Sequence, residues 1–462
     1  MSWSAARAAH LPVAPNAVWA VLADLGRWPQ WAPSLARAHL DGPAALGVTG
    51  GYVPAHRALG PLHDRTAPAM SVTAFEPGRQ LEITHPTPLG SMRIEWTLVQ
   101  QDGGTLLTQT IEVKGVSAPF VVLAVARTLD RDFQLAPARL ARLAGWTPDR
   151  RLPRVVIAGG SGSLGRLLAA RLSARGHDVR ILTRSHDPGL PFDQVLWDGR
   201  TTGAWTRVLE DEADGPGVAL VNLAGRLVDV RPTAANIAGL RDSRVDSTRA
   251  LVAASATLHR PLVAWLQAST TAIWSDAGEL RLTEDSPLPD PGLPQMTGVA
   301  RAWEEATRGA LTDHLVLLRT SIVLDRDAPA LKVLARLTRA GLGGRVGTGR
   351  QWFSWIHHED WLRVSVAALG LDPQLRLPAG PLVAAAPHPV RNAELMAALR
   401  RHLHRPPAPP TPTVLLRLGA VALRSDPALA LTGRHCTSSV LAAAGFTFDH
   451  PDLASALREI LG

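Results

Sequence analysis

The chain has 462 residues, 46% of them hydrophobic, so it is long enough for two or three domains with sizeable cores. Its formal charge of +8 comes mainly from arginines scattered among acids, with no basic run, so we expect no nucleic-acid partner. A lone Cys436 excludes a disulfide framework, and no apolar run is long enough to span a bilayer, so we expect a cytoplasmic protein.

The first 147 residues are predicted to form an α+β domain. A helical pattern over 16–25 precedes four alternating stretches that are typical of antiparallel strands, and an apolar helical pattern over 120–143 ends the domain. The four stretches are 71–75, 80–84, 92–99 and 106–113. Pro137 is expected to kink the last helix.

This layout and the string VWAVLADLGRWPQWAPSL at 18–35 resemble the START-like, polyketide-cyclase-like helix-grip family over residues 1–147. In that family the sheet wraps the long helix around an apolar cavity. The resemblance therefore implies an apolar small-molecule ligand for this domain. Trp19, Trp28 and Trp31 are consistent with lining such a cavity, but packing in a core is the favoured interpretation for each. No catalytic grouping is visible here.

A polar, proline-bearing stretch at 148–153 is the predicted linker to a second domain. Strand-like runs then alternate with helical stretches, which favours a doubly wound parallel sheet, a Rossmann domain, over 154–386. The expected strands are 154–158, 178–183, 194–197, 219–223, 262–268 and 315–319. The composition of the sequence changes after that domain, and residues 387–462 are expected to form a small C-terminal substrate or lid segment.

A β-branched strand runs directly into a glycine-rich turn, VVIAGGSGSLG at 155–165, and a helical pattern follows. Glycines let the backbone approach a pyrophosphate, whose charge then rests on the N–H groups and dipole at the start of the helix. The alternative is an ordinary glycine-rich turn without a ligand. The residues assigned to a dinucleotide site are Gly159, Gly160, Ser161, Gly162, Ser163, Leu164 and Gly165.

The residues after the next strands indicate which dinucleotide is bound. Arg184 stands where NAD-selective proteins carry an acid for the adenosine ribose, and an arginine suits a 2′-phosphate. We therefore expect NADP, the alternative being a solvated arginine. Asp198 is expected at the adenine edge, and Asn222, Ala224 and Gly225 beside the nicotinamide half.

Four longer sequence strings make a family resemblance of the second part of the chain specific. They are NLAG at 222–225, SRV at 243–245, QASTTAIWSD at 267–276 and LGGRVGTGRQWFSWIHHED at 342–360. With them, residues 154–462 resemble the nucleoside-diphosphate-sugar-epimerase-like branch of the short-chain dehydrogenase/reductase superfamily. The string AAGFTFDHPDLASAL at 443–457 resembles that branch's C-terminal domain of unknown function. Members of this kind commonly lack the catalytic Tyr and Lys, and this chain has no Tyr-x-x-x-Lys pair in the region.

By the resemblance, residues 295–306 form the helix that usually carries the Tyr-x-x-x-Lys pair. Ala300 then stands at the tyrosine position and Glu304 at the lysine position. A glutamate there is able to accept a hydrogen bond from the nicotinamide ribose, which assigns Glu304 to the cofactor site. A solvated residue in the Glu-Glu pair is the alternative.

If chemistry persists, the proton has to move through another group. The sequence offers Ser269 and Thr270 after the fifth strand, and the resemblance points to His357, for which the family has a related motif. A capping or structural histidine is the alternative for His357. The histidines and acids at 357–360 predict no metal, because no second ligand group at zinc-like spacing accompanies them.

Five glycines between 341 and 349 lead into Trp352, Phe353 and Trp355, a composition that suits a substrate lid. An ordinary flexible connection is the alternative. Arg319, at the end of the sixth strand, is able to meet an anionic substrate group or to remain a surface charge.

Two functions fit these patterns. The first is an atypical, NADP-dependent, epimerase-like oxidoreductase that acts on a hydrophobic or nucleotide-sugar-like small molecule. The second is an NADP(H)-binding regulatory or scaffold protein that has lost catalysis and senses an apolar ligand through its N-terminal domain. The missing Tyr and Lys favour the second function, and the glycine- and aromatic-rich loop favours the first.

Overall fold

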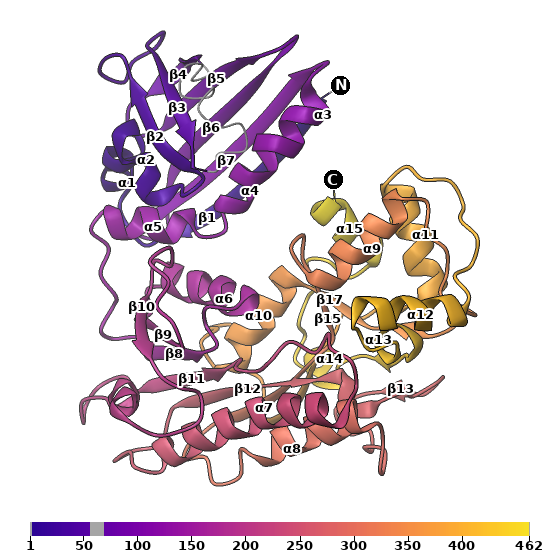
Figure 1. Cartoon of the computed structure of the whole chain (residues 1–462). Coiled ribbons are helices and arrows are strands. Elements are labelled where there is room, and N and C mark those ends of the chain that lie inside the picture. Colours follow the sequence, from indigo (N-terminus) through magenta and orange to yellow (C-terminus); the bar gives the residue numbers. More distant parts are fainter. Residues whose placement is uncertain (1, 56–68, 462) are drawn as a thin grey trace. The chain divides into compact units, whose positions relative to one another are not determined.

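The computed structural model describes residues 2–55 and 69–461, which form two compact units (Figure 1). The first unit holds the chain up to Leu152, with Arg166–Val179 and Asp187–Asp193. The second holds Pro153–Gly165, Arg180–His186 and the chain from Gln194 onward. Among the described helices, none offers an apolar stretch that could bridge a bilayer.

The first unit contains one antiparallel sheet, whose strands follow the order β1-β7-β6-β5-β4-β3-β2 within the described residues. Its long strands alternate between a buried and a less buried face, as in β6, where Met92, Ile94, Trp96 and Leu98 are buried. The strands are β1 Ser2–Leu11, β2 Leu35–Leu40, β3 Thr49–Pro54, β4 Ala69–Glu76, β5 Gln80–Thr87, β6 Gly90–Gln101 and β7 Gly104–Gly115.

Helices cover the buried face of this sheet and complete one hydrophobic core. The predicted helix over 120–143 is broken after Asp132: one helical stretch, with a π-helical turn inside it, covers 118–132, and a second helix starts at Ala136. Pro137 lies in the first turn of the second helix, where its missing N–H costs nothing, so it starts a helix instead of kinking one. The helices are α1 Pro15–Leu22, α2 Trp28–Trp31, α3 Ala118–Val121, α4 Arg127–Asp132 and α5 Ala136–Leu143, with a π-helical turn Val122–Ala126 joining α3 to α4.

The second unit contains a sheet with the strand order β10-β9-β8-β11-β12-β14-β18. The pairs from β8 through β11, β12 and β14 to β18 are parallel. All five residues of β11 are buried, as expected for a central parallel strand covered on both faces. The strands are β8 Arg154–Ala158, β9 Val179–Thr183, β10 Asp193–Leu196, β11 Val218–Asn222, β12 Ala264–Thr270, β14 Leu315–Thr320 and β18 Gly380–Ala384.

The strand order reverses between β8 and β11, and in parallel sheets a crevice for ligands opens at such a point, beyond the carboxyl ends of the strands. Helices α7 and α8 lie side by side against the sheet (Figure 1). Gly176, with φ +95°, closes α6 in the left-handed conformation typical of a helix end. The helices up to the sixth strand are α6 Ser163–Ala174, most of which falls in the first unit, and α7 Ala234–Ser255 and α8 Val299–Glu305 of the second.

Further helices follow the sixth strand, and those at 329–339, 392–402 and 453–461 contribute Leu331, Leu395 and Leu457 to a separate hydrophobic cluster that includes Leu324 and Trp355. They are α9 Pro329–Arg339, α10 His358–Ala368, α11 Asn392–His402, α12 Thr413–Leu423, α13 Ala428–Leu431, α14 Ser439–Ala443 and α15 Leu453–Leu461. Short strands connect these parts: β13 Arg281–Leu282, β15 Ile322–Leu324, β16 Trp352–Phe353, β17 Trp355–His357, β19 Val390–Arg391 and β20 His435–Cys436.

The glycine-rich loop before β16 is held to the proline-rich segment near residue 410. Gly347 N donates to Thr411 O at 2.9 Å, and Thr411 N donates to Arg345 O at 2.8 Å. Trp355, one of the aromatic residues after the loop, is fully buried. The loop is thus anchored at two points, and its role as a substrate lid stays a prediction.

Candidate functional site

A tightly packed glycine turn joins β8 to α6 at the carboxyl end of the sheet. Gly159 has φ +76°, and a Cβ there would lie 2.8 Å from the carbonyl carbon of Leu223. A Cβ on Gly165 would lie 2.6 Å from the Cα of Gly160. These positions require glycine, as the backbone of a dinucleotide-binding turn does.

The tip of this turn is open to solvent. Ser161, Gly162 and Ser163 are exposed, and α6 begins at Ser163, whereas Leu164 is half-buried. The first N–H groups of a helix have no partner within the helix, and together with the helix dipole they attract anions. The turn can therefore receive a diphosphate.

Arg184 directly follows β9 and is exposed. The end of β9 is held near the glycine turn, because Thr183 Oγ1 lies 3.5 Å from Ser161 Oγ and donates to Ser185 O at 2.9 Å. The guanidinium thus belongs to the same edge of the sheet as the turn, which is the position predicted for contact with a 2′-phosphate.

Asp198, predicted at the adenine edge, is exposed and uses its carboxylate locally. It accepts hydrogen bonds from Arg200 N at 2.8 Å, Thr201 N at 2.9 Å and Thr201 Oγ1 at 2.6 Å. These bonds, that of the Thr201 hydroxyl foremost, lower the pKa of Asp198 to about 2. Asp198 therefore shapes its own turn, and a contact with adenine stays a prediction.

Asn222 is completely buried at the end of β11 and orders the loop that follows. Its Nδ2 donates to Thr248 Oγ1 at 3.0 Å and to Gln267 Oε1 at 3.1 Å, while its Oδ1 accepts from Ala224 N at 3.1 Å. The side chain is thus satisfied within the protein. Ala224 and Gly225, half-buried and exposed, are the parts of this loop that can border the crevice.

A buried positive charge lies beneath the same loop. Arg244 on α7 is 9% exposed, and a Cβ on Gly225 would lie 3.2 Å from its Cζ. Its guanidinium donates to Arg226 O and Leu240 O at 3.0 Å and lies 4.9 Å from the ring centre of Trp303. Burial lowers the pKa of Arg244 to about 10, still well above neutral pH. No carboxylate of the described residues pairs with this charge.

Glu304, at the predicted lysine position, is held by a buried ion pair. Arg319 reaches its two carboxylate oxygens with Nε at 2.9 Å and Nη2 at 3.0 Å, and Ser269 Oγ donates to Glu304 Oε1 at 2.6 Å. The side chains of Arg319 and Glu304 are 7% and 10% exposed. The structure thus unites three residues that the sequence had assigned to cofactor, substrate and catalysis.

The predicted tyrosine position is part of a core. Ala300 is 1% exposed and belongs to a hydrophobic cluster with Ile273 and Trp274. Thr270, at the end of β12, is half-buried, and its Oγ1 accepts from Ala272 N at 3.1 Å. That bond uses the oxygen of Thr270 and leaves its O–H available, whereas the O–H of Ser269 is committed to Glu304.

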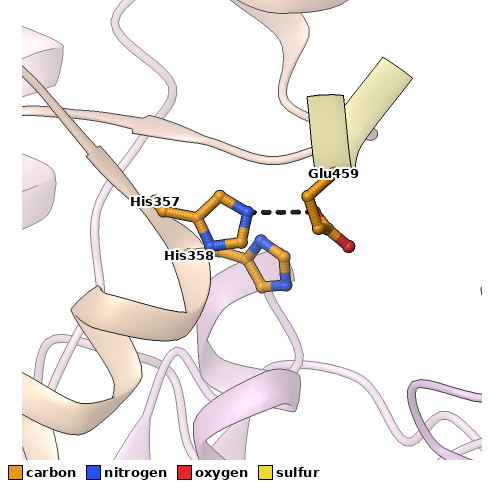
Figure 2. A group of neighbouring side chains, drawn as sticks. All are labelled: His357, His358 and Glu459. Atoms are coloured by element: carbon orange, nitrogen blue, oxygen red, sulfur yellow. Dashed lines mark hydrogen bonds and ion pairs between the residues drawn. The ribbon is translucent and has the colours of Figure 1, made fainter. Parts of the chain in front are cut away.

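His357 lies fully buried at the start of α10, in a separate cluster (Figure 2). Its Nδ1 accepts from Glu359 N at 3.3 Å and caps the helix, and its Nε2 lies 3.0 Å from Glu459 Oε2 on α15. Burial lowers the pKa of His357 below its usual value, which favours a neutral ring at neutral pH. Both ring nitrogens are engaged in joining α10 to α15, and proton donation by His357 stays a prediction.

Ligand atoms of His357, His358 and Glu459 lie within 4.8 Å of one another (Figure 2). Because His357 Nδ1 accepts a backbone N–H, the proton of its neutral ring sits on Nε2 and points at Glu459. A metal would need the lone pair at Nε2 and a proton on Nδ1, the opposite tautomer. The cluster therefore fits an N–H to carboxylate bond better than a metal site.

Two features of this edge escaped the sequence reasoning: the pairing of Glu304 with Arg319 and the buried charge of Arg244. The first depends on strand register, which places Ser269 opposite Arg319 on neighbouring strands and which the sequence alone does not give. The second had no signal either, because an SRV string on a helix does not reveal which residue turns inward.

Comparison with known proteins gives matches to three family models. Residues 2–145 match the family model "Polyketide cyclase / dehydrase and lipid transport". Residues 155–297 match "NAD dependent epimerase/dehydratase family", and residues 411–460 match a domain of unknown function, DUF1731. These matches agree with both resemblances drawn from the sequence.

Several relatives and solved structures are similar to the chain. The bovine (Bos taurus) "Epimerase family protein SDR39U1" is 31% identical over 314 residues, which are 67% of this chain and 99% of the relative. A crystal structure of the human SDR39U1 protein with NADPH has a TM-score of 0.57 at 28% identity and covers 67% of this chain and 99% of its own.

A nucleoside-diphosphate sugar epimerase from Corynebacterium glutamicum extends the similarity to the whole chain. It has a TM-score of 0.60 at 25% identity and covers 99% of this chain and 90% of its own. The antiparallel N-terminal unit, the parallel sheet with its glycine turn and these relatives lead to one conclusion: the chain belongs to the epimerase family, with a polyketide-cyclase-like domain at its N-terminus.

Proposed function

We propose that residues 154–462 bind NADP(H) and act as an NADP-dependent, epimerase-like oxidoreductase on a small molecule. The observation that carries this proposal is the closely packed turn at Gly159–Gly165 with the exposed Arg184 on the same edge of the sheet. The human relative that was crystallised with NADPH supports it. We further infer that Ala224 and Gly225 border the nicotinamide half.

NADPH would supply a hydride to a substrate carbonyl. Thr270 is our candidate for orienting that carbonyl, because it is half-buried at the end of β12 and its O–H is available. The carbonyl oxygen would take its proton from water, since Ala300 offers none and both nitrogens of His357 are engaged.

A second function is favoured by the closed network of Glu304, Arg319 and Ser269. It engages the carboxylate and one of the two hydroxyls that the sequence assigns to the site, and no acid stands in place of the missing tyrosine. In this alternative the protein binds NADP(H) without catalysis and responds to the ligand of its N-terminal unit.

For that N-terminal unit we infer an apolar small-molecule ligand. The support is its match to a family described by polyketide cyclases, dehydrases and lipid transport. A small pocket between its sheet and helices is lined by aliphatic and aromatic side chains, among them Trp28, Trp31 and Trp96.

Calorimetric titration of the full chain with NADPH and with NADH tests cofactor binding. We expect saturable binding of one NADPH per chain, and no saturable binding of either nucleotide would contradict both functions. Thr270→Val then tests the reductase function. If the protein is a reductase, this variant loses turnover of carbonyl substrates by about tenfold or more while keeping its NADPH affinity. Unchanged turnover would remove Thr270 from the reaction.

A further inference from the structure

The first unit contains two segments that adjoin the proposed NADP site along the chain. One starts at Arg166, which directly follows the glycine turn, and the other is the 187–193 loop, which begins three residues after Arg184. Within this loop Leu190 and Phe192 are buried, at 7% and 5% exposure, so the loop is anchored by its own apolar side chains. The backbone of the loop therefore continues directly into the residue that is proposed to meet the 2′-phosphate.

Two arginines of α5 bind this loop. Arg139 Nη2 donates to Gly189 O at 2.5 Å, and Arg142 Nη1 donates to Pro191 O at 2.8 Å. Arg142 Nη2 also forms an ion pair with Asp193 at 2.7 Å. The two guanidinium groups thus hold the loop at three successive odd-numbered positions.

Helix α5 is itself fixed in the core of the first unit. Arg139 and Arg142 are three residues apart and share one face of the helix, whereas Leu140 is fully buried in the core of the antiparallel sheet and its helices. Charges of both segments act on Arg139. Burial lowers the pKa of its guanidinium, the carboxylates of Asp132 and Asp187 act in the opposite direction, and Arg166 adds to the lowering.

A held loop matters to NADPH more than to NADH. An exposed arginine loses rotamer freedom when it binds a phosphate, and any freedom of its backbone adds to that cost. A loop that is already held at Gly189, Pro191 and Asp193 removes the backbone part of this cost before the cofactor binds. NADH has no 2′-phosphate, so its affinity should not depend on how Arg184 is placed.

We propose that Arg139 and Arg142 are positioning residues of the NADP site, which hold the 187–193 loop so that Arg184 is set for the 2′-phosphate. The inference rests on the proposed NADP site and deepens it, because it makes the polyketide-cyclase-like domain a support of the selectivity for NADP over NAD. Neither arginine of α5 contacts the cofactor in this account, and both act through the loop.

Calorimetric titration of the full chain with NADPH and with NADH tests the inference. The double variant Arg139→Met, Arg142→Met should weaken NADPH about fivefold and change NADH by less than about twofold. The matched control is Arg37→Met, Arg79→Met. It removes two exposed arginines of the same unit, in β2 and in the turn between β4 and β5, and should leave the ratio of the two affinities unchanged.

Asp193→Lys separates positioning from a plain effect of charge. It leaves both arginines in place, repels Arg142 from the loop and makes this part of the unit more positive. If the arginines acted only by attracting the phosphate through space, Asp193→Lys would strengthen NADPH binding. We expect the opposite, a loss of about threefold for NADPH with NADH unchanged.

Equal weakening of NADPH and NADH in the double variant would indicate general damage to the fold and overturn the inference, as would an unchanged ratio or tighter NADPH binding in Asp193→Lys. If Arg184→Ala abolishes the preference for NADPH and the double variant keeps it, the NADP site stands and only the inference is wrong. If the unmodified protein does not prefer NADPH, both are wrong. Should the double variant not fold, Arg142→Met and Asp193→Lys decide in its place.

Discussion

The structure gives Glu304 a different role from the one that the sequence predicted. Its position in the helix assigned it to the nicotinamide ribose, yet its carboxylate is bound by Arg319 and Ser269. A side chain so engaged first serves to hold α8 against β12 and β14. The sequence predicted the exchange of lysine for glutamate but not its partner, because pairing across strands depends on register.

Replacing Glu304 by Gln should destabilise the second unit by about 3–5 kcal/mol, because it leaves the charge of Arg319 buried and unpaired. Urea unfolding followed by tryptophan fluorescence measures the effect. The double variant Glu304→Gln, Arg319→Met should recover part of the loss, since it removes the stranded charge. A loss below about 1 kcal/mol in the single variant would mean that the ion pair is worth no more than a surface one.

Arg244 places an unpaired positive charge beneath the loop that follows β11. Oxidised NADP carries a positive charge on its nicotinamide ring and NADPH does not, so this charge should favour the reduced form. We expect Arg244→Met to strengthen the binding of NADP⁺ relative to that of NADPH by about fivefold. Arg249→Met, an exposed arginine of the same helix, is the control. Equal weakening of both forms would indicate a purely structural role.

At the scale of elements, the parallel sheet was predictable and parts of the first unit were not. Six strands of the second unit lie within two residues of their expected bounds, because buried parallel strands appear as continuous apolar runs. Strand β1 was missed because its sequence is SWSAARAAHL. Its many alanines give little contrast in polarity between the two faces of the strand. The break after Asp132 was missed because the apolar pattern continues across it.

The glycine turn yields a prediction about the whole βα element. Gly159→Ala would force a Cβ into the backbone of Leu223 at a positive φ, so it should lower NADPH affinity by about tenfold or more. Gly162→Ala would meet only Gly159 O at 3.2 Å and has no positive φ, so its loss should be smaller. Calorimetric titration of both variants with NADPH measures the two losses of affinity. A larger loss in Gly162→Ala than in Gly159→Ala would show that this turn does not hold the phosphates.

At the scale of the whole molecule, the protonation of His85 makes the free energy of unfolding depend on pH. Its pKa is about 4 in the folded protein and 6.5 in the unfolded chain, so the unfolded state binds more protons between these values. Stability should therefore fall as the pH drops from 6.5 to 4, by roughly 3 kcal/mol from this residue. His85→Phe should flatten the fall in unfolding experiments, and an unchanged pH dependence would show that His85 is not buried as a neutral ring.

The central claim, an NADP site built from the glycine turn and Arg184, is tested most directly by the ratio of two affinities. We predict that NADPH binds about tenfold more tightly than NADH and that Arg184→Ala removes this preference by weakening NADPH alone. Arg249→Ala, which removes an equal charge elsewhere, should keep the preference. Equal affinity for NADPH and NADH in the unmodified protein, or a preference that survives Arg184→Ala, would contradict the claim.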